Sequence, residues 1–68
     1  MITYNLEKDN KTDKYYVQSK LYRYEFDWEI MIQVRRKFEF YKYAEDLEQW
    51  YSDLDMFTKK KIRKGELL

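Results

Sequence analysis

Apolar and polar residues alternate with a period of two over much of the first 41 residues. In residues 2–6 the order Ile-Thr-Tyr-Asn-Leu predicts a short half-buried strand. Residues 7–14 are polar throughout and include the Asn and Asp that turns favour, so we expect a hairpin loop there. Further strands are predicted within residues 15–41, where aromatic and β-branched residues are common.

The longest alternating stretch covers residues 22–40. Its even positions are apolar except for Arg36, and its odd positions are mostly charged, which predicts a sheet with one apolar and one charged face. Because strands seldom exceed about ten residues, we expect a turn inside the stretch, at residues 27–29 or 35–37. The apolar residues stay on even positions on both sides of that turn, which requires a loop or bulge with an odd number of residues. Arg36, the one charged residue on an even position, favours the turn at residues 35–37.

After Tyr41 the spacing of apolar residues changes to that of an amphipathic helix. Apolar positions recur three and four residues apart, with acidic residues near the beginning and basic residues near the end. Gly65 stands where glycine commonly ends a helix. We expect one long helix over about residues 43–64; the alternative is that residues 52–55 cap a second helix and break the first.

These elements predict a single α+β domain over residues 1–68. The expected fold is a small antiparallel β-sheet of about three strands packed against one long C-terminal amphipathic helix. A domain of this length buries only about 60% of the surface that its unfolded chain exposes, so its core needs large side chains. The aromatic content of 21% supplies them.

The residue types that usually carry catalysis or bind metals are scarce. The chain has no His and no Cys, and its single Gly does not suffice for a phosphate-binding loop. We expect the carboxylate pairs at positions 27/29, 45/46 and 53/55 to lie on charged faces beside water, where they are not buried enough to act as an acid–base pair. We therefore expect a non-enzymatic protein without a catalytic site, cofactor or metal.

The start of the chain and its composition bear on location and origin. No basic segment, apolar run or cleavage site follows Met1, and no apolar stretch has the roughly 18–20 residues of a membrane span. We expect a cytoplasmic protein that does not contact membranes. Residue types with A/T-rich codons outnumber Gly, Ala, Arg and Pro, a composition that resembles short proteins of low-GC bacteria and their phages or mobile elements.

Three groups of surface residues are candidate binding sites. The acidic first half of the predicted helix has two interpretations: a surface that imitates DNA phosphates, or a solvated helix face without a partner. Two basic clusters suit nucleic-acid phosphates, although the helix dipole or a protected strand edge explains them without a ligand. The acidic residues are Glu45, Asp46, Glu48, Asp53 and Asp55, and the basic residues are Arg35, Arg36, Lys37, Lys59, Lys60, Lys61, Arg63 and Lys64.

Tyrosine forms the third group. The inward positions of the strands, with Leu47, Trp50, Leu54 and Phe57 from the helix, fill a core of this size. Some of the remaining tyrosines must then be exposed, and tyrosine is enriched at protein interfaces. The candidate interface aromatics are Tyr15, Tyr16, Tyr41, Tyr43 and Tyr51.

The first functional hypothesis is a phage or mobile-element protein that binds and inhibits a host nucleic-acid-processing or defence complex, in the manner of anti-CRISPR proteins. The second rests on the run Arg35-Arg36-Lys37-Phe38 leading into Ala44, Leu47 and Trp50, which resembles the last strand and helix of integrase arm-type domains. That resemblance implies DNA binding through a three-stranded sheet. The third is a structural protein whose edge strand pairs two copies into a homodimer.

Overall fold

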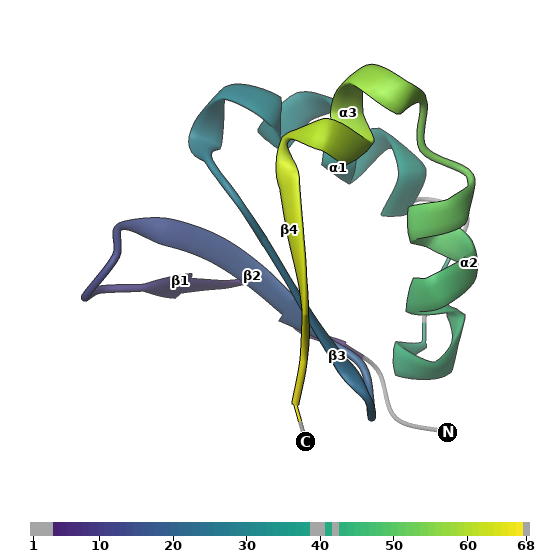
Figure 1. Cartoon of the computed structure of the whole chain (residues 1–68), viewed down its shortest axis with the longest axis horizontal. Coiled ribbons are helices and arrows are strands. Elements are labelled where there is room, and N and C mark those ends of the chain that lie inside the picture. The colour runs from purple at the N-terminus through teal and green to yellow at the C-terminus, as the bar shows by residue number, and fades with distance from the viewer. Residues whose placement is uncertain (1–3, 39–40, 42, 68) are drawn as a thin grey trace.

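Helices fold over one face of an antiparallel sheet in this protein. The computed structural model describes residues 4–38, 41 and 43–67, which form an α+β fold with a four-stranded sheet in the order β1-β2-β3-β4. Figure 1 shows α1 and α3 at the top and α2 along the side. The elements are β1 (Glu7–Asp9), β2 (Lys14–Gln18), β3 (Tyr22–Phe26), η1 (Trp28–Ile30), α1 (Met31–Phe38), η2 (Ala44–Asp46), α2 (Leu47–Ser52), α3 (Met56–Lys60) and β4 (Ile62–Glu66).

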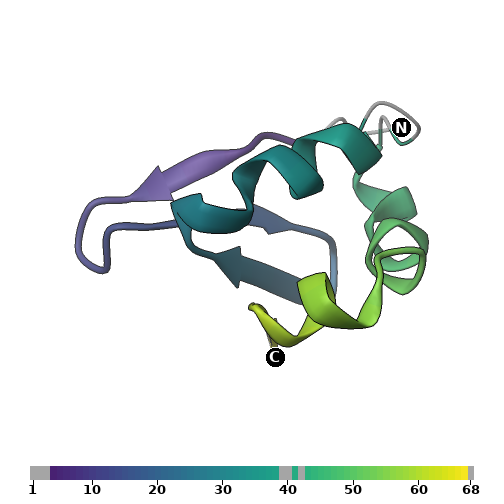
Figure 2. The same cartoon turned by 90° about the horizontal axis from the view of Figure 1, so that it is seen from above.

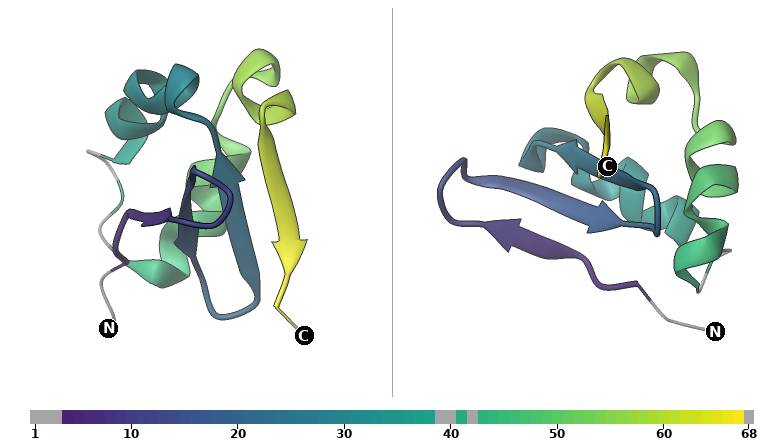
Figure 3. Two further views of the ribbon diagram at one scale, coloured as in Figure 1. Left: turned by 90° about the vertical axis from the view of Figure 1, so that its left-hand side faces the viewer. Right: turned by 60° about the horizontal axis from the view of Figure 1, so that its bottom comes forward.

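The register of the sheet places its apolar side chains on one face. Val17 of β2 lies opposite Tyr24 of β3, and Phe26 of β3 lies opposite Ile62 of β4. Because side chains alternate along a strand, these residues point to the helices, and all four are buried. In the left view of Figure 3 the strands stand in front of α2, and the face toward the viewer is uncovered.

An aromatic cluster joins the sheet to the helices. Trp50 of α2 is fully buried, with its ring centroid 5.6 Å from that of Tyr24 in β3 and 4.7 Å from that of Phe38 in α1. The Tyr24 ring meets Trp50 edge-on, a favoured geometry for aromatic pairs. Seen from above, α1 lies over the sheet (Figure 2). The helical side chains buried in this core are Ile30, Met31, Val34, Leu47 and Trp50, and Leu54 joins them from the bend between α2 and α3.

The predicted α+β class and antiparallel sheet are confirmed, but the N-terminal strand is displaced. Within the predicted strand 2–6, residues 4–6 are irregular and residues 2 and 3 lie outside the described residues. The predicted loop 7–14 instead contains β1, and its turn is confined to residues 10–13. There the carboxylate of Asp9 accepts a hydrogen bond from the Lys11 backbone N–H at 2.9 Å, which shows the turn chemistry expected of Asp.

The prediction that strands continue through residues 27–38 is wrong. Strand β3 ends at Phe26, and the chain then forms η1 and α1. Residues four positions apart share one face of a strand and also one face of a helix. The apolar residues Ile30, Val34 and Phe38 therefore fit either structure. The predicted turn at 27–29 falls where η1 begins, and the one at 35–37 lies inside α1. The even position Ile32, apolar and yet 66% exposed, distinguishes the helix from the strand.

The prediction of one long helix over residues 43–64 is also wrong, and its alternative break is confirmed. Asp55 caps α3, because its carboxylate accepts a hydrogen bond from the Thr58 backbone N–H at 2.7 Å. The last predicted helical turn is β4, in which Gly65 lies opposite Arg23. Residues 62–66 form a strand because they pair with the free edge of β3, and no local pattern predicts that contact.

We predict that Asp55→Ala lowers the stability of the protein and that Ser52→Ala does not. Asp55 satisfies a backbone donor at the start of α3, whereas the side chain of Ser52 is exposed at the end of α2. The midpoint of urea unfolding, followed by circular dichroism, measures both effects. Equal midpoints for Asp55→Ala and the unmodified protein would contradict the assignment of the cap.

We predict that the Tyr24→Phe variant is at least as stable as the unmodified protein. The Tyr24 hydroxyl is buried without a hydrogen-bond partner among the described residues, and its burial raises the pKa of Tyr24 to about 12. Removing that hydroxyl should leave the free energy of unfolding unchanged or raise it by about 1 kcal/mol. Tyr24→Ala, which removes the ring, should cost about 3–5 kcal/mol. Urea unfolding measures the stability of both variants. A clear loss of stability in Tyr24→Phe would show that the hydroxyl has a stabilising partner in the core.

Candidate functional site

Four large apolar side chains remain exposed at the end of the molecule where η1, α1 and α3 lie. Trp28 is 67% exposed, Ile32 66%, Met56 71% and Phe57 67%. Figure 1 shows α1 and α3 together at this end, opposite the turn between β2 and β3. We name the surface of these four residues the apical surface. Exposed apolar side chains that gather in one place commonly mark a binding site.

The first half of the apical surface comes from η1 and α1. Trp28 and Ile32 are four residues apart and therefore project from the same side of this helical segment, while Ile30 and Met31 enter the core. The Trp28 ring packs at a tilt against Tyr15 of β2, with 5.8 Å between the ring centroids. This contact supports Trp28 from the sheet without burying it.

A lysine joins the two halves of the apical surface. The Nζ atom of Lys61 lies 3.0 Å from Oε1 of Glu29 in η1 and 5.3 Å from the ring centroid of Phe57 in α3. Because one ammonium group reaches both elements, Phe57 lies close to the segment that carries Trp28 and Ile32. We therefore treat Trp28, Ile32 and Phe57 as one surface and include Met56, which precedes Phe57 in α3 and is also exposed.

The charges around the apical surface are unevenly compensated. Two lysines compensate the acidic residues there, because Lys14 Nζ lies 3.4 Å from Asp27 Oδ1 and Lys61 pairs with Glu29. Arg35, Arg36 and Lys60 are exposed and form no ion pair within the part of the chain that the structure describes. Asp55, the exposed cap of α3 next to Met56, also forms no ion pair among the described residues, so these three cations and one carboxylate leave a net positive charge next to the apolar side chains.

The predicted basic residues do not form one continuous cluster. Arg35, Arg36 and Lys37 occupy the last turn of α1, and Lys59 and Lys60 occupy the last turn of α3, where cations favour the helix dipole. Lys61 lies in the turn that follows and pairs with Glu29. The two residues in β4 face opposite ways. They are Arg63, on the uncovered face, and Lys64, whose Nζ lies 4.2 Å from the Tyr22 ring centroid on the helix side.

Two of the five predicted acidic residues have structural partners. Asp53 accepts hydrogen bonds from the Tyr41 hydroxyl and from Gln49 Nε2, and these bonds, with Lys37 and Lys59 nearby, lower the pKa of Asp53. Asp55 caps α3, and the same Thr58 hydrogen bond lowers its pKa. Basic residues therefore lie close to this part of the acidic group, so that it is not a purely negative surface.

The other three acidic residues differ in exposure. Glu45 and Glu48 are exposed, while Asp46 is half-buried. Burial of the Tyr4 hydroxyl, together with the charge of Asp46, raises the pKa of Tyr4. A role of these residues in imitating DNA phosphates stays a prediction.

All five tyrosines singled out in the sequence are half-buried. Tyr15 packs against Trp28, Tyr41 donates to Asp53, and Tyr51 lies 5.3 Å from Tyr24 between ring centroids. Tyr16 belongs to the uncovered face of the sheet, and Tyr43 precedes η2. Their role at an interface stays a prediction. Among the described residues, the strongly exposed aromatic ones are Trp28 and Phe57, which the sequence pattern places in the core.

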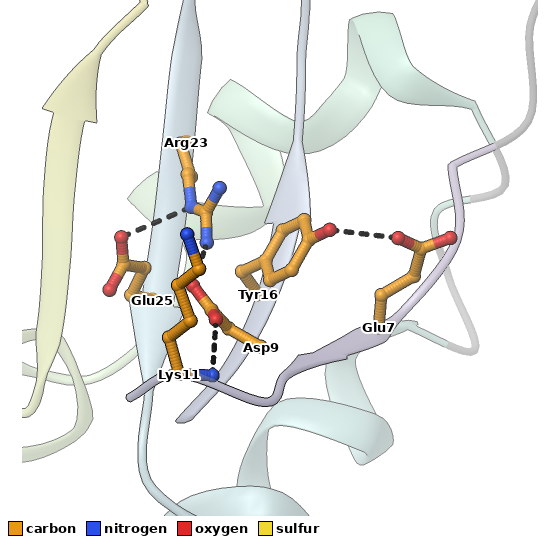
Figure 4. A network of polar contacts seen from close by, with 6 residues as sticks. All are labelled: Glu7, Asp9, Lys11, Tyr16, Arg23 and Glu25. Atoms are coloured by element: carbon orange, nitrogen blue, oxygen red, sulfur yellow. Dashed lines mark hydrogen bonds and ion pairs between the residues drawn. The ribbon is translucent and has the colours of Figure 1, made fainter. Parts of the chain in front are cut away.

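The uncovered face of the sheet carries an internally compensated polar network. The guanidinium group of Arg23 forms ion pairs with Asp9 at 3.0 Å and Glu25 at 3.1 Å, and it stacks 3.8 Å from the Tyr16 ring centroid (Figure 4). The Tyr16 hydroxyl donates to Glu7 Oε2 at 2.8 Å. Two carboxylates thus neutralise Arg23, which leaves this arginine without free charge for nucleic-acid phosphates. The run at residues 35–38, compared above with a strand of integrase arm-type domains, belongs to α1.

A surface hollow at the opposite end of the molecule was not foreseen from the sequence. It has a volume of about 430 Å³ and lies between the start of β1, the turn after β2, and η2. One of its walls is Tyr4, whose hydroxyl donates to the Tyr41 carbonyl oxygen at 2.6 Å. The other lining residues are Asn5, Glu7, Tyr16, Gln18, Ser19, Lys20, Ala44 and Glu45.

We predict that acid weakens the network on the uncovered face. The Lys11 backbone N–H, with a smaller contribution from Arg23, lowers the pKa of Asp9 below its ordinary value of 3.8. A carboxyl whose pKa is lower in the folded state stabilises the fold above about pH 4, and this stability is lost as the pH falls through the folded pKa. Asp9→Asn should therefore lose less stability between pH 6 and pH 3 than the unmodified protein.

Urea unfolding at the two pH values measures this difference. Glu48→Gln, which removes an exposed carboxylate on α2, is the matched control and should keep the acid sensitivity of the unmodified protein. An Asp9→Asn variant with the same acid sensitivity as that control would show that this carboxylate does not stabilise the folded state.

Within residues 4–38, 41 and 43–67, no group of acidic side chains is arranged to hold a metal ion, and no helix has the length and apolar character needed to cross a bilayer. Protein-family models, curated proteins and solved structures were each searched with the chain, and none of them matches it.

Proposed function

We propose that this chain is a small non-catalytic binding protein that contacts a protein partner through its apical surface. The observation that carries this proposal is the exposure of Trp28, Ile32, Met56 and Phe57 at one end of the molecule. Tryptophan, phenylalanine and methionine are enriched at the centres of protein interfaces. Their burial against a partner would supply most of the binding energy.

Protein contact is better supported than DNA binding through the sheet. The face of the sheet that the helices leave uncovered holds Arg23 in ion pairs with Asp9 and Glu25, so this arginine is not free to contact phosphate. The apical surface, in contrast, presents two aliphatic or thioether side chains, Ile32 and Met56, which cannot stack on bases as aromatic rings do. These side chains suit an apolar protein surface.

We further propose that the partner belongs to a host nucleic-acid-processing or defence complex, which the chain inhibits as anti-CRISPR proteins do. The excess of residues with A/T-rich codons over Gly, Ala, Arg and Pro supports this part of the proposal, because such a composition resembles that of proteins from low-GC bacteria and their phages or mobile elements. It concerns the identity of the partner and is independent of the surface that binds it.

Site-specific photocrosslinking in cells that encode the chain tests the proposed surface. A benzophenone amino acid is placed at position 28 or 57, and the matched control carries it at Leu21, which is 52% exposed in the turn after β2. Both apical positions should yield an adduct with the same protein, and the control position should not. Adducts that form at position 21 but not at the apical positions would contradict the proposal.

The captured partner then allows a measurement of affinity. Trp28→Ala and Phe57→Ala should each weaken binding by about 2 kcal/mol, or about 30-fold in Kd, as at other interface hot spots. Leu21→Ala should leave the Kd unchanged. Isothermal titration calorimetry measures all three, and unchanged affinity in both apical variants would refute the proposed surface.

A further inference from the structure

We propose that the apical surface recognises an acidic amphipathic helix of its protein partner. This inference rests on the proposed function and specifies the chemistry of the partner segment. Apolar side chains of that helix would cover Trp28, Ile32 and Phe57, and its carboxylates would contact the basic residues beside them.

The first argument is the sign of the charge left free at this surface. Lys14 and Lys61 compensate the neighbouring acidic residues Asp27 and Glu29, with distances of 3.4 and 3.0 Å. These pairs add no net charge to the apical surface. The chain as a whole carries a formal net charge of only +1, so the attraction of an acidic partner must come from this local excess of positive charge.

The second argument is the position of the free cations. Arg35 and Arg36 follow Ile32 by three and four residues, so they project from the same exposed side of α1. Lys60 follows Phe57 by three residues in α3 and is also exposed. Cations therefore flank the apolar side chains on both elements, and an arginine guanidinium binds a carboxylate through two parallel hydrogen bonds.

The third argument is the number of cations, which favours a protein over an anionic membrane. Membrane-binding basic surfaces typically gather roughly four to eight Lys or Arg residues. Six basic residues occupy the ends of α1 and α3, but Lys61 pairs with Glu29, and Lys37 and Lys59 are half-buried near Asp53. This leaves Arg35, Arg36 and Lys60 exposed without an ion pair among the described residues. An amphipathic helix instead requires an apolar strip with a few charges at its border, because its own apolar residues recur three and four positions apart.

Two synthetic peptides of equal length test this inference. Both carry Leu and Phe at helical spacing, and the polar face consists of Glu in one peptide and of Lys in the other. The Glu peptide should bind, with shifts in the amide spectrum confined to residues 28–36 and 56–61, and binding should weaken as salt is added. The Lys peptide should bind at least tenfold more weakly.

Charge reversal supplies the decisive comparison. In the triple variant R35E/R36E/K60E the preference should invert, so that the Lys peptide binds better than the Glu peptide. The matched control K11E/K20E/R63E changes the net charge equally at exposed positions away from the apical surface and should keep the original preference. Circular dichroism confirms that both variants are folded.

The other outcomes overturn the inference. Equal binding of the two peptides, or an unchanged preference in R35E/R36E/K60E, excludes recognition by charge. Binding at this surface of anionic phosphatidylserine vesicles or of duplex DNA, but not of the Glu peptide, assigns it another ligand. If the crosslinked partner still depends on Trp28 and Phe57 but not on Arg35, Arg36 and Lys60, the proposed function stands and this inference fails.

Discussion

Burial of Trp50 is the interaction on which the rest of the structure depends. Its ring contacts Tyr24 of the sheet and Phe38 of α1, so one side chain of α2 links all three parts of the fold. A chain of 68 residues has room for one such cluster. Once Trp50, Tyr24 and Phe26 fill it, the core has no place for Trp28 or Phe57, which project into solvent.

Local contacts then determine where those exposed side chains lie. The Asp55 cap starts α3 in a new direction after α2, and the short turn at Lys61 returns the chain to β4. The pair between Lys61 and Glu29 joins the turn after α3 to the η1–α1 segment. An exposed ion pair of this kind contributes little to stability, so the buried core, and not this pair, determines the arrangement of the apical surface.

The sequence pattern predicted some of these features and missed others for identifiable reasons. Strand β3 and the break before α3 follow from alternation and from the capping potential of Asp55. Helix α1 does not follow from the pattern, because apolar residues four positions apart fit the period of a strand as well as that of a helix. Strand β4 depends on pairing with β3, residues 36 or more positions earlier in the chain, and a local pattern holds no information about that contact.

The candidate site was harder to predict than the fold. Periodicity indicates which face of an element is apolar, but the decision between core and solvent depends on how much space the other elements leave. Trp28 and Phe57 follow the apolar pattern and yet are exposed, while the five selected tyrosines are half-buried. Trp28 is exposed while Trp50 is buried, and fluorine NMR of protein labelled with 5-fluorotryptophan distinguishes the two side chains. Trp28 should show a solvent isotope shift between H₂O and D₂O that partner binding removes, and Trp50 should show none in either state. If neither resonance of the free protein responds to solvent, Trp28 is not exposed. If the Trp28 resonance of the complex still responds to solvent, the partner does not cover this side chain.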